Sequence, residues 1–313
     1  MTGVTGDGVP PAPPDFDAFW AATLADARSR ATAPTFVGYP TALRTLVVED
    51  ATFSGFDGQR IKAWMLRPAG AAERLPVVVE YLGYGGGRSL PIERLVWPSA
   101  GYAYLVMDSR GQNGDTPDVH EPPTTGQHPG FLTSGINDPL HLYYRRLITD
   151  AVLAVDAVAD HPSVDPRRIV VTGESQGGAL ALAVAGLSTR VAAACIDVPF
   201  LCDIRRGVEL AEEGPYAELV AYLAFRRDLV ESAFSTLAYV DGLHFAARAT
   251  APALFSTGRL DRSCPPETVV AAQRAYRGEA EIRIWPFNGH DAGELHQQLE
   301  RFEFLARLGI TPD

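Results

Sequence analysis

The sequence predicts an α/β fold with one central, mostly parallel sheet that helices cover on both faces. Two patterns favour this fold. Short apolar strands alternate with helical segments along most of the 313 residues, which is typical of parallel sheets. In addition, the segment Gly173–Gly177 reads Gly-Glu-Ser-Gln-Gly and joins a predicted strand directly to a predicted helix. Length alone suggests about two domains, but α/β folds of this size often form a single domain. We therefore expect a single domain over residues 1–313.

The chain begins with a proline-rich arm at residues 10–14, followed by a helix, so that the N-terminal segment covers about residues 10–30. Asp15 stands where an N-cap is expected. The apolar face of this helix comprises Phe16, Phe19, Trp20 and Leu24. The spacing of these side chains places them on one side of a helix.

The predicted strands are recognised by their β-branched and apolar runs. They span residues 44–52, 60–67, 76–81, 102–108, 168–172, 191–198, 252–257 and 281–286. The turn residues Asp57 and Gly58 predict a hairpin between the first two strands. The predicted helices after the arm cover residues 139–160, 178–185 and 290–308.

Two segments interrupt this alternation. Residues 113–137 are rich in Gly, Pro, Thr and Asp, and a loop of this length is usually functional or mobile. Residues 199–247 carry helical, polar and aromatic stretches. We expect this second segment to be a helical insertion over the site, because ligands on parallel sheets bind at the carboxyl ends of the strands.

Composition narrows the functional classes. The chain is 46% hydrophobic and 21% charged, with a net charge of −11 and no basic run, which argues against nucleic acid as a partner. No stretch of about 18 apolar residues predicts a membrane span, and the N-terminus lacks a signal-peptide pattern, so we expect a cytoplasmic protein. The three irregularly spaced cysteines predict reduced, buried thiols.

The motif around Ser175 is typical of a serine nucleophile on a sharp strand-to-helix turn. Gly173 and Gly177 stand two residues before and after the serine, where the chain comes too close for larger side chains. The alternative is a tight turn that carries a serine only for its small size. The apolar strand before the motif and the helix after it favour the catalytic interpretation.

A nucleophilic serine needs a base and an orienting carboxylate, and on such sheets the order along the chain is Ser, acid, His. His290 lies in a predicted loop, residues 288–291, just after the last strand and is the predicted base; His244 and His296 are the other histidines after the serine. Asp261 follows the second-to-last strand and is the predicted acid. Its rival, Asp197, ends the strand after the motif, where a structural role is the more ordinary interpretation.

An oxyanion intermediate needs preoriented N–H donors. We predict the backbone amides of Gln176, which follows the serine, and of Tyr84 in the glycine-rich loop Gly83–Gly87. This loop is no phosphate site, because no Gly-Lys-Ser/Thr follows. The segment 290–296 lacks the H-E-x-x-H spacing of a zinc site. No metal or cofactor is therefore expected.

In three motifs the sequence resembles the acetyl xylan esterase and cephalosporin C deacetylase family, which is family seven of the carbohydrate esterases. They are Arg110-Gly111-Gln112, the elbow Gly173–Gly178, and His290-Asp291, which departs from the family's His-Glu. The same resemblance extends over residues 15–20, 143–146, 197–202, 241–248 and 264–268. It therefore covers nearly the whole chain.

The resemblance implies an α/β-hydrolase fold, a Ser175–His290–Asp261 triad, and oxyanion donors at Tyr84 and Gln176. It also implies small acetyl ester substrates, namely acetylated xylose oligomers and cephalosporin C, and homo-hexamers. Arg110 and Gln112 lie near the site by chain position. We interpret both as structural support, with Arg110 pairing a buried carboxylate; direct substrate contact is the alternative.

The sequence thus predicts a serine esterase that removes acetyl groups from small sugar esters through an acetyl-enzyme. Two alternatives stay open. One is an esterase or peptidase of the same fold with another acyl preference, which acyl-chain preference distinguishes. The other is a non-catalytic binding protein, because a fold by itself does not establish turnover.

Overall fold

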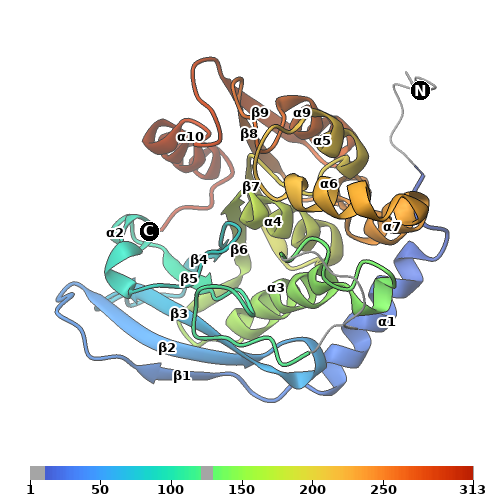
Figure 1. Cartoon of the computed structure of the whole chain (residues 1–313). Coiled ribbons are helices and arrows are strands. Elements are labelled where there is room, and N and C mark those ends of the chain that lie inside the picture. The colour runs from blue at the N-terminus through green and yellow to red at the C-terminus, as the bar shows by residue number, and fades with distance from the viewer. Residues whose placement is uncertain (1–10, 121–129, 313) are drawn as a thin grey trace.

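The computed structural model describes residues 11–120 and 130–312. A nine-stranded sheet crosses the molecule, with helices on both faces (Figure 1). The strands are β1 (Thr35–Gly38), β2 (Leu46–Ser54), β3 (Arg60–Pro68), β4 (Leu75–Tyr81), β5 (Ala103–Met107), β6 (Val164–Glu174), β7 (Val191–Asp197), β8 (Ala253–Gly258) and β9 (Ala280–Trp285).

The strand order is β1-β2-β3-β5-β4-β6-β7-β8-β9. The pairs from β5 to β9 are parallel, whereas β1, β2, β3 and β5 pair antiparallel. The predicted mostly parallel sheet is confirmed. All of its parallel strands end at one edge, so the residues that follow them meet there.

The helices are α1 (Phe16–Ser29), α2 (Val96–Ser99), α3 (Tyr143–Ala159), α4 (Gln176–Leu187), α5 (Ile204–Leu210), α6 (Tyr216–Phe225), α7 (Val230–Leu237), α8 (Gly242–Ala246), α9 (Pro266–Ala275) and α10 (Glu294–Arg307). Helices α1, α3, α4, α8 and α9 contribute to one apolar cluster, whereas α2 and α10 contribute to a second. Successive residues of β4 alternate between these clusters: Val77 and Val79 belong to the first, and Val78 to the second. This alternation explains the continuous apolar run of that strand.

Each predicted strand has its counterpart, and the predicted hairpin joins β2 to β3. At its turn Asp57 and Gly58 both have positive φ values, of 55° and 71°. Strand β1 and helix α9 were not predicted. Strand β1 has four residues, none of them buried, and so shows no apolar alternation.

Three expectations need correction. Asp15 stands at the N-cap of α1 but makes no capping hydrogen bond, because its carboxylate accepts from the Tyr239 hydroxyl at 2.5 Å. The helix predicted from residue 139 begins at Tyr143, after a 3₁₀ turn at Pro139–His141. The last helix begins at Glu294 rather than at residue 290, whereas His290 lies in the preceding loop, as predicted.

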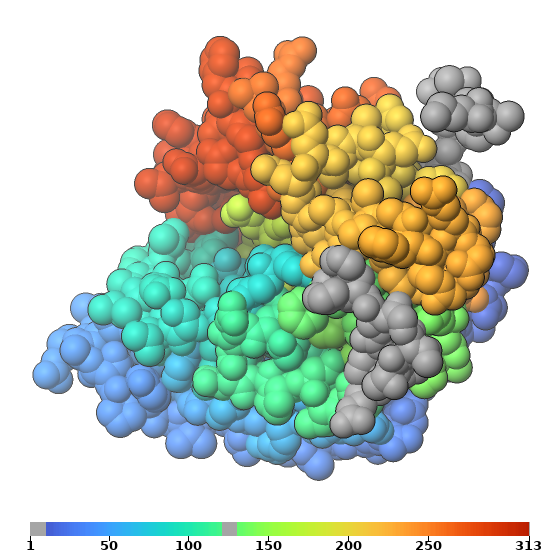
Figure 2. Space-filling view, viewed as in Figure 1, coloured from blue at the N-terminus to red at the C-terminus, as the bar shows by residue number. Residues whose placement is uncertain are grey.

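The segment 199–247 has two different roles. Its first part lines a cavity beside Ser175, through Gly214, Pro215 and Glu218. Its last part, helix α8, is buried against α4 and belongs to the core instead of a cap. Figure 2 shows a hollow in the surface where the insertion, the segment around residues 80–100 and the C-terminal part meet.

The three cysteines Cys195, Cys202 and Cys264 are free and buried, as predicted. Of the loop predicted at 113–137, residues 121–129 lie outside the described part, and the described remainder holds neither helix nor strand. In the part of the chain that the structure describes, no helix has the length and apolarity needed to cross a membrane.

Candidate active site

Ser175 lies on a strained turn between β6 and α4. Its φ of 59° and ψ of −117° are unusual for a residue with a side chain. A Cβ at Gly173 would approach the carbonyl carbon of Gly177 to 2.3 Å, and a Cβ at Gly177 would approach the Tyr81 oxygen to 2.0 Å. The backbone on both sides therefore requires glycine, as the motif predicts. The turn holds the serine clear of the sheet edge.

His290 and Asp261 lie together at this edge. The imidazole Nδ1 is 2.9 Å from the Asp261 Oδ2. The other carboxylate oxygen accepts backbone N–H groups from Ser263 at 2.9 Å and Cys264 at 2.8 Å. Because an ionised carboxylate only accepts hydrogen bonds, this contact places the proton of neutral His290 on Nδ1 and leaves Nε2 free to accept one.

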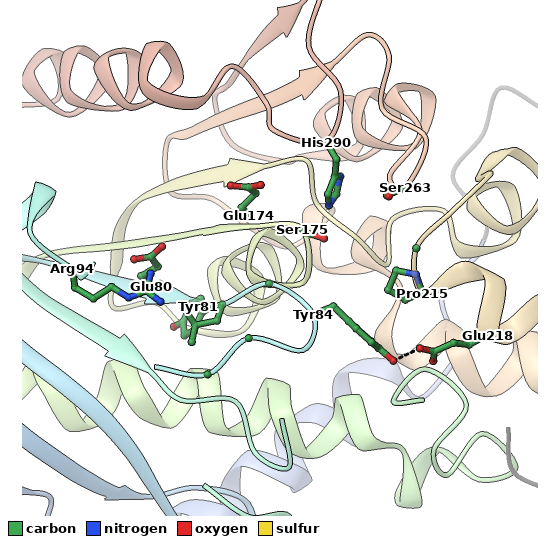
Figure 3. Close-up of a pocket in the computed structure, with 15 residues that line it drawn as sticks. Glu80, Tyr81, Tyr84, Arg94, Glu174, Ser175, Pro215, Glu218, Ser263 and His290 are labelled. Atoms are coloured by element: carbon green, nitrogen blue, oxygen red, sulfur yellow. Dashed lines mark hydrogen bonds between the residues drawn. The ribbon is translucent and has the colours of Figure 1, made fainter. Parts of the chain in front are cut away.

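The His290 ring is directed toward Ser175 (Figure 3), and both residues line one cavity of about 640 Å³. Burial by itself would lower the pKa of His290. The hydrogen bond and negative charge of Asp261 outweigh this effect and raise the pKa above its ordinary value of 6.5. The arrangement can thus provide a serine hydroxyl, a base and an orienting carboxylate.

The rival acid, Asp197, is a structural carboxylate. It is wholly buried and accepts hydrogen bonds from Gln297 at 2.8 Å and from the Arg301 Nε at 2.9 Å. Its other partner is the Ser256 hydroxyl. These bonds join β7 and β8 to α10, and the carboxylate has no contact with His290.

The rival bases lie elsewhere. His244 is buried on α8 against the Phe16 ring, and burial lowers its pKa to about 4. His296 is exposed on α10 beside Trp285. Neither lines the cavity that holds Ser175.

The two predicted oxyanion donors lie on adjoining elements. Gln176 is the first residue of α4, so its backbone N–H has no carbonyl partner within the helix. Tyr84 lies in the glycine-rich loop after β4 and lines the cavity. Its hydroxyl points away from Ser175 and donates to Glu218 of α6 at 2.5 Å (Figure 3).

Two glutamine side chains hold the glycine-rich loop in place. The Gln112 Oε1 accepts the Gly85 N–H at 2.7 Å, and the Gln176 Nε2 donates to the Leu82 carbonyl at 3.2 Å. The two side-chain amides also contact each other, with the Gln112 Nε2 2.9 Å from the Gln176 Oε1. Gln112 therefore acts on the Tyr84 loop and makes no contact with the Ser175 hydroxyl.

Arg110 pairs with a buried carboxylate. Its Nε lies 2.5 Å from the Asp150 Oδ2 and its second guanidinium nitrogen 2.7 Å from Oδ1. Both side chains are wholly buried. The Arg110 carbonyl accepts the Tyr143 hydroxyl at 2.6 Å, and that hydroxyl in turn accepts from Gln112. Arg110 lies beneath the site and is absent from the cavity lining.

This geometry predicts a large loss of stability on substitution of Arg110. In the Arg110→Met variant the Asp150 carboxylate stays buried without its partner, so the free energy of unfolding should fall by about 3–5 kcal/mol, measured by urea denaturation. The double variant Arg110→Met/Asp150→Leu should recover much of this loss. Equal stability of the parent and the single variant would contradict the assigned role.

Asp291 occupies the position at which the family that the sequence resembles has Glu. Its carboxylate accepts the Asn288 side-chain amide at 2.7 Å, and its carbonyl accepts the Glu294 N–H at 2.9 Å. Both bonds lie within the loop that carries His290. The shorter acid thus stabilises this loop locally.

Several cavity residues were missed by sequence reasoning, namely Glu80, Arg94, Glu174, Gly214, Pro215, Glu218 and Ser263. Glu80 offered a signal, because it is the one charged residue in an otherwise apolar strand and lies near its carboxyl end. Arg94 and Glu218 offered none. Among the described residues, no group of three or more His, Cys, Asp or Glu side chains is arranged to hold a metal ion.

The chain is similar to known proteins over nearly its whole length. The family model Acetyl xylan esterase (AXE1) matches residues 5–308. The chain is 28% identical over 293 residues to the acetyl esterase Axe7A of Xylanibacter ruminicola. This match covers 89% of the chain and 63% of Axe7A, so the chain spans less than two thirds of that relative's length.

Among solved structures, the acetyl xylan esterase from Paenibacillus sp. R4 is 37% identical, with a TM-score of 0.89 over 96% of both chains. Acetyl xylan esterase 1 from Thermoanaerobacterium sp. JW/SL YS485 is 29% identical, with the same TM-score and coverage. The acylaminoacyl peptidase of Pyrococcus horikoshii, 18% identical with a TM-score of 0.62, shares the α/β-hydrolase fold alone. The chain belongs to the acetyl xylan esterase family of carboxylic ester hydrolases, which confirms the resemblance seen in its sequence.

Proposed function

We propose that this protein is a serine esterase that removes acetyl groups from small acetylated sugars, such as xylo-oligosaccharides, through an acetyl-enzyme. One observation carries the proposal. Ser175, on a strained elbow, shares a cavity with His290, whose Nδ1 lies 2.9 Å from the buried Asp261 carboxylate. The names of the related acetyl esterases support the acetyl group as the part that is removed.

The proposed reaction has two halves. His290 Nε2 takes the proton of the Ser175 hydroxyl as its oxygen attacks the acetyl carbonyl carbon, and the amides of Tyr84 and Gln176 donate to the resulting oxyanion. The carbon–oxygen bond to the sugar then breaks, and the sugar oxygen takes the proton from His290. Water repeats these steps on the acetyl-enzyme and releases acetate. Asp261 holds the imidazole in the required tautomer throughout.

Acetate release tests this function and its main alternatives. Acetylated xylobiose should be deacetylated faster than butyrylated xylobiose, because a site shaped for acetyl excludes a longer acyl chain sterically. Preference for butyrate would favour the alternative esterase of the same fold. If no ester is hydrolysed and a fluorophosphonate labels no residue, the protein is instead a non-catalytic binding protein. The family resemblance also suggests cephalosporin C as an acetyl ester substrate, and acetate release from it should be measured in the same assay.

The pH profile should follow the state of His290. The base must be neutral, and its pKa is raised above 6.5 by Asp261, so kcat/KM should fall as pH decreases through a value above 6.5. In the Asp261→Asn variant the charge that stabilises the imidazolium is absent. This acid limb should therefore move to lower pH, while the plateau falls about 10³- to 10⁴-fold. If the acid limb of the pH profile stays at the same pH in Asp261→Asn, Asp261 is not the carboxylate that raises the pKa of His290.

Two further expectations stay predictions. The family resemblance suggests a homo-hexamer, which sedimentation equilibrium of the purified protein would test. A cytoplasmic location is the second expectation, and fractionation of the source cells would test it.

A further inference from the structure

One side of the cavity carries three charged side chains that the proposed mechanism does not use. Glu80 lies near the carboxyl end of β4, Glu174 ends β6, and Arg94 follows the 3₁₀ turn Pro91–Glu93. We call these three residues the charged wall. All three line the same cavity as Ser175 and His290. Figure 3 shows Arg94 and Glu80 side by side, with Glu174 between them and His290.

The charged wall has unused hydrogen-bonding capacity. The Arg94 Nε is buried and has no partner among the described residues. Burial raises the pKa of the Glu80 carboxyl, and the positive charge of Arg94 partly opposes this shift. Neither these two side chains nor Glu174 forms a side-chain hydrogen bond or close ion pair within the part of the chain that the structure describes. By contrast, the guanidinium of Arg110 is bonded to its own carboxylate, Asp150. The described residues thus leave hydrogen-bonding capacity of the charged wall unused.

The chemistry of an acetate ester determines which part of it can reach this wall. The acetyl half has one polar group, its carbonyl, and that group must lie at Ser175. A methyl group needs no charged partner. The wall therefore faces the alcohol half. Carboxylates accept hydrogen bonds from hydroxyl groups and a guanidinium donates them, whereas an apolar alcohol would leave these charged groups unpaired, at a cost in affinity.

We propose that Glu80, Arg94 and Glu174 form the subsite for the alcohol half of the ester and select neutral, hydroxyl-rich alcohols. This inference rests on the proposed esterase function and adds the residues that recognise the sugar. Together with Glu218, the cavity lining holds three carboxylates and one guanidinium. An anionic alcohol half, such as that of cephalosporin C with its ring carboxylate, meets repulsion there. Neutral sugar acetates are therefore preferred over that ester.

The test compares two acetates that share the acyl group and differ in the alcohol. For the parent and for Arg94→Met, kcat/KM is measured with acetylated xylobiose and with 4-nitrophenyl acetate. Methionine keeps an unbranched apolar stem and removes the donors. The ratio of the two values, sugar over nitrophenyl, should fall about 10- to 100-fold in Arg94→Met, as expected for the loss of hydrogen bonds from a charged group. In Arg44→Met, a matched change at an exposed residue outside the cavity, the ratio should equal that of the parent.

A second variant tests the charge. In Glu80→Gln, which keeps shape and removes a negative charge, kcat/KM for cephalosporin C should rise severalfold relative to acetylated xylobiose. The subsite would be overturned if the ratio of kcat/KM for acetylated xylobiose to that for 4-nitrophenyl acetate stays unchanged in Arg94→Met, even if both values fall. An unchanged or lower cephalosporin C ratio in Glu80→Gln would overturn it as well. Absence of hydrolysis of every acetate by the parent would instead reject the proposed function itself.

Discussion

Replacing Ser175 with alanine should lower kcat for acetate release from acetylated xylobiose about 10⁴- to 10⁶-fold. The hydroxyl oxygen forms the bond to the acetyl carbon in the proposed first step, and no other group on the elbow can replace it. The residual rate would come from the oxyanion donors and from substrate binding. Circular dichroism and thermal unfolding would check that the variant keeps its fold, since the backbone of Ser175 is strained.

Ser263 provides a matched control for this substitution. It also lines the cavity, but it lies in the loop after β8 and its backbone N–H binds Asp261. The Ser263→Ala variant removes one hydroxyl from the same cavity and should retain kcat to within about tenfold. If Ser175→Ala and Ser263→Ala lose activity equally, or if Ser175→Ala remains active, Ser175 is not the nucleophile.

The His290→Gln variant should lose activity to a similar extent, about 10⁴- to 10⁶-fold in kcat. Glutamine can occupy the same space and can still contact Asp261, but its amide cannot take the serine proton. The serine then stays a hydroxyl, which is a weak nucleophile at neutral pH. Fluorophosphonate labelling should slow in parallel, because it depends on the same activation.

His296 is the matched control for the base. It lies six residues further along the chain, exposed on α10 and outside the cavity. The His296→Gln variant should therefore retain the parent's kcat and labelling rate. Comparable losses in both histidine variants would indicate general destabilisation of this segment and would remove the support for His290 as the base.

Those features that depend on local sequence were predictable. The elbow was recognised because the glycines, the strand and the helix around Ser175 are consecutive in the chain, and the steric reason for Gly173 and Gly177 follows from that geometry. The positions expected for His290 and Asp261 follow from strand order, since each residue follows a parallel strand that ends at the same edge. The sheet topology therefore brings residues that are far apart in the sequence close together.

The remaining features depend on contacts that no local pattern encodes. The bonds from Gln112 to Gly85 and to Gln176 join three separate segments. The hydroxyl of Tyr84 reaches Glu218 in the insertion, 134 residues away. Similarly, the proposed charged wall arises only when the ends of β4 and β6 lie side by side. Helix α9 was missed because its buried face is short: of its ten residues, Thr268, Val269 and Ala272 are buried.

The most direct test of the central claim is to follow acetate release while a fluorophosphonate progressively modifies the protein. Peptide mass spectrometry gives the fraction of Ser175 modified in each sample, and the same samples are assayed with acetylated xylobiose. The account predicts that the rate of acetate release falls in direct proportion to the modified fraction of Ser175 and reaches zero when modification is complete. Continued acetate release from fully modified protein, or inactivation with the label on another residue, would contradict it.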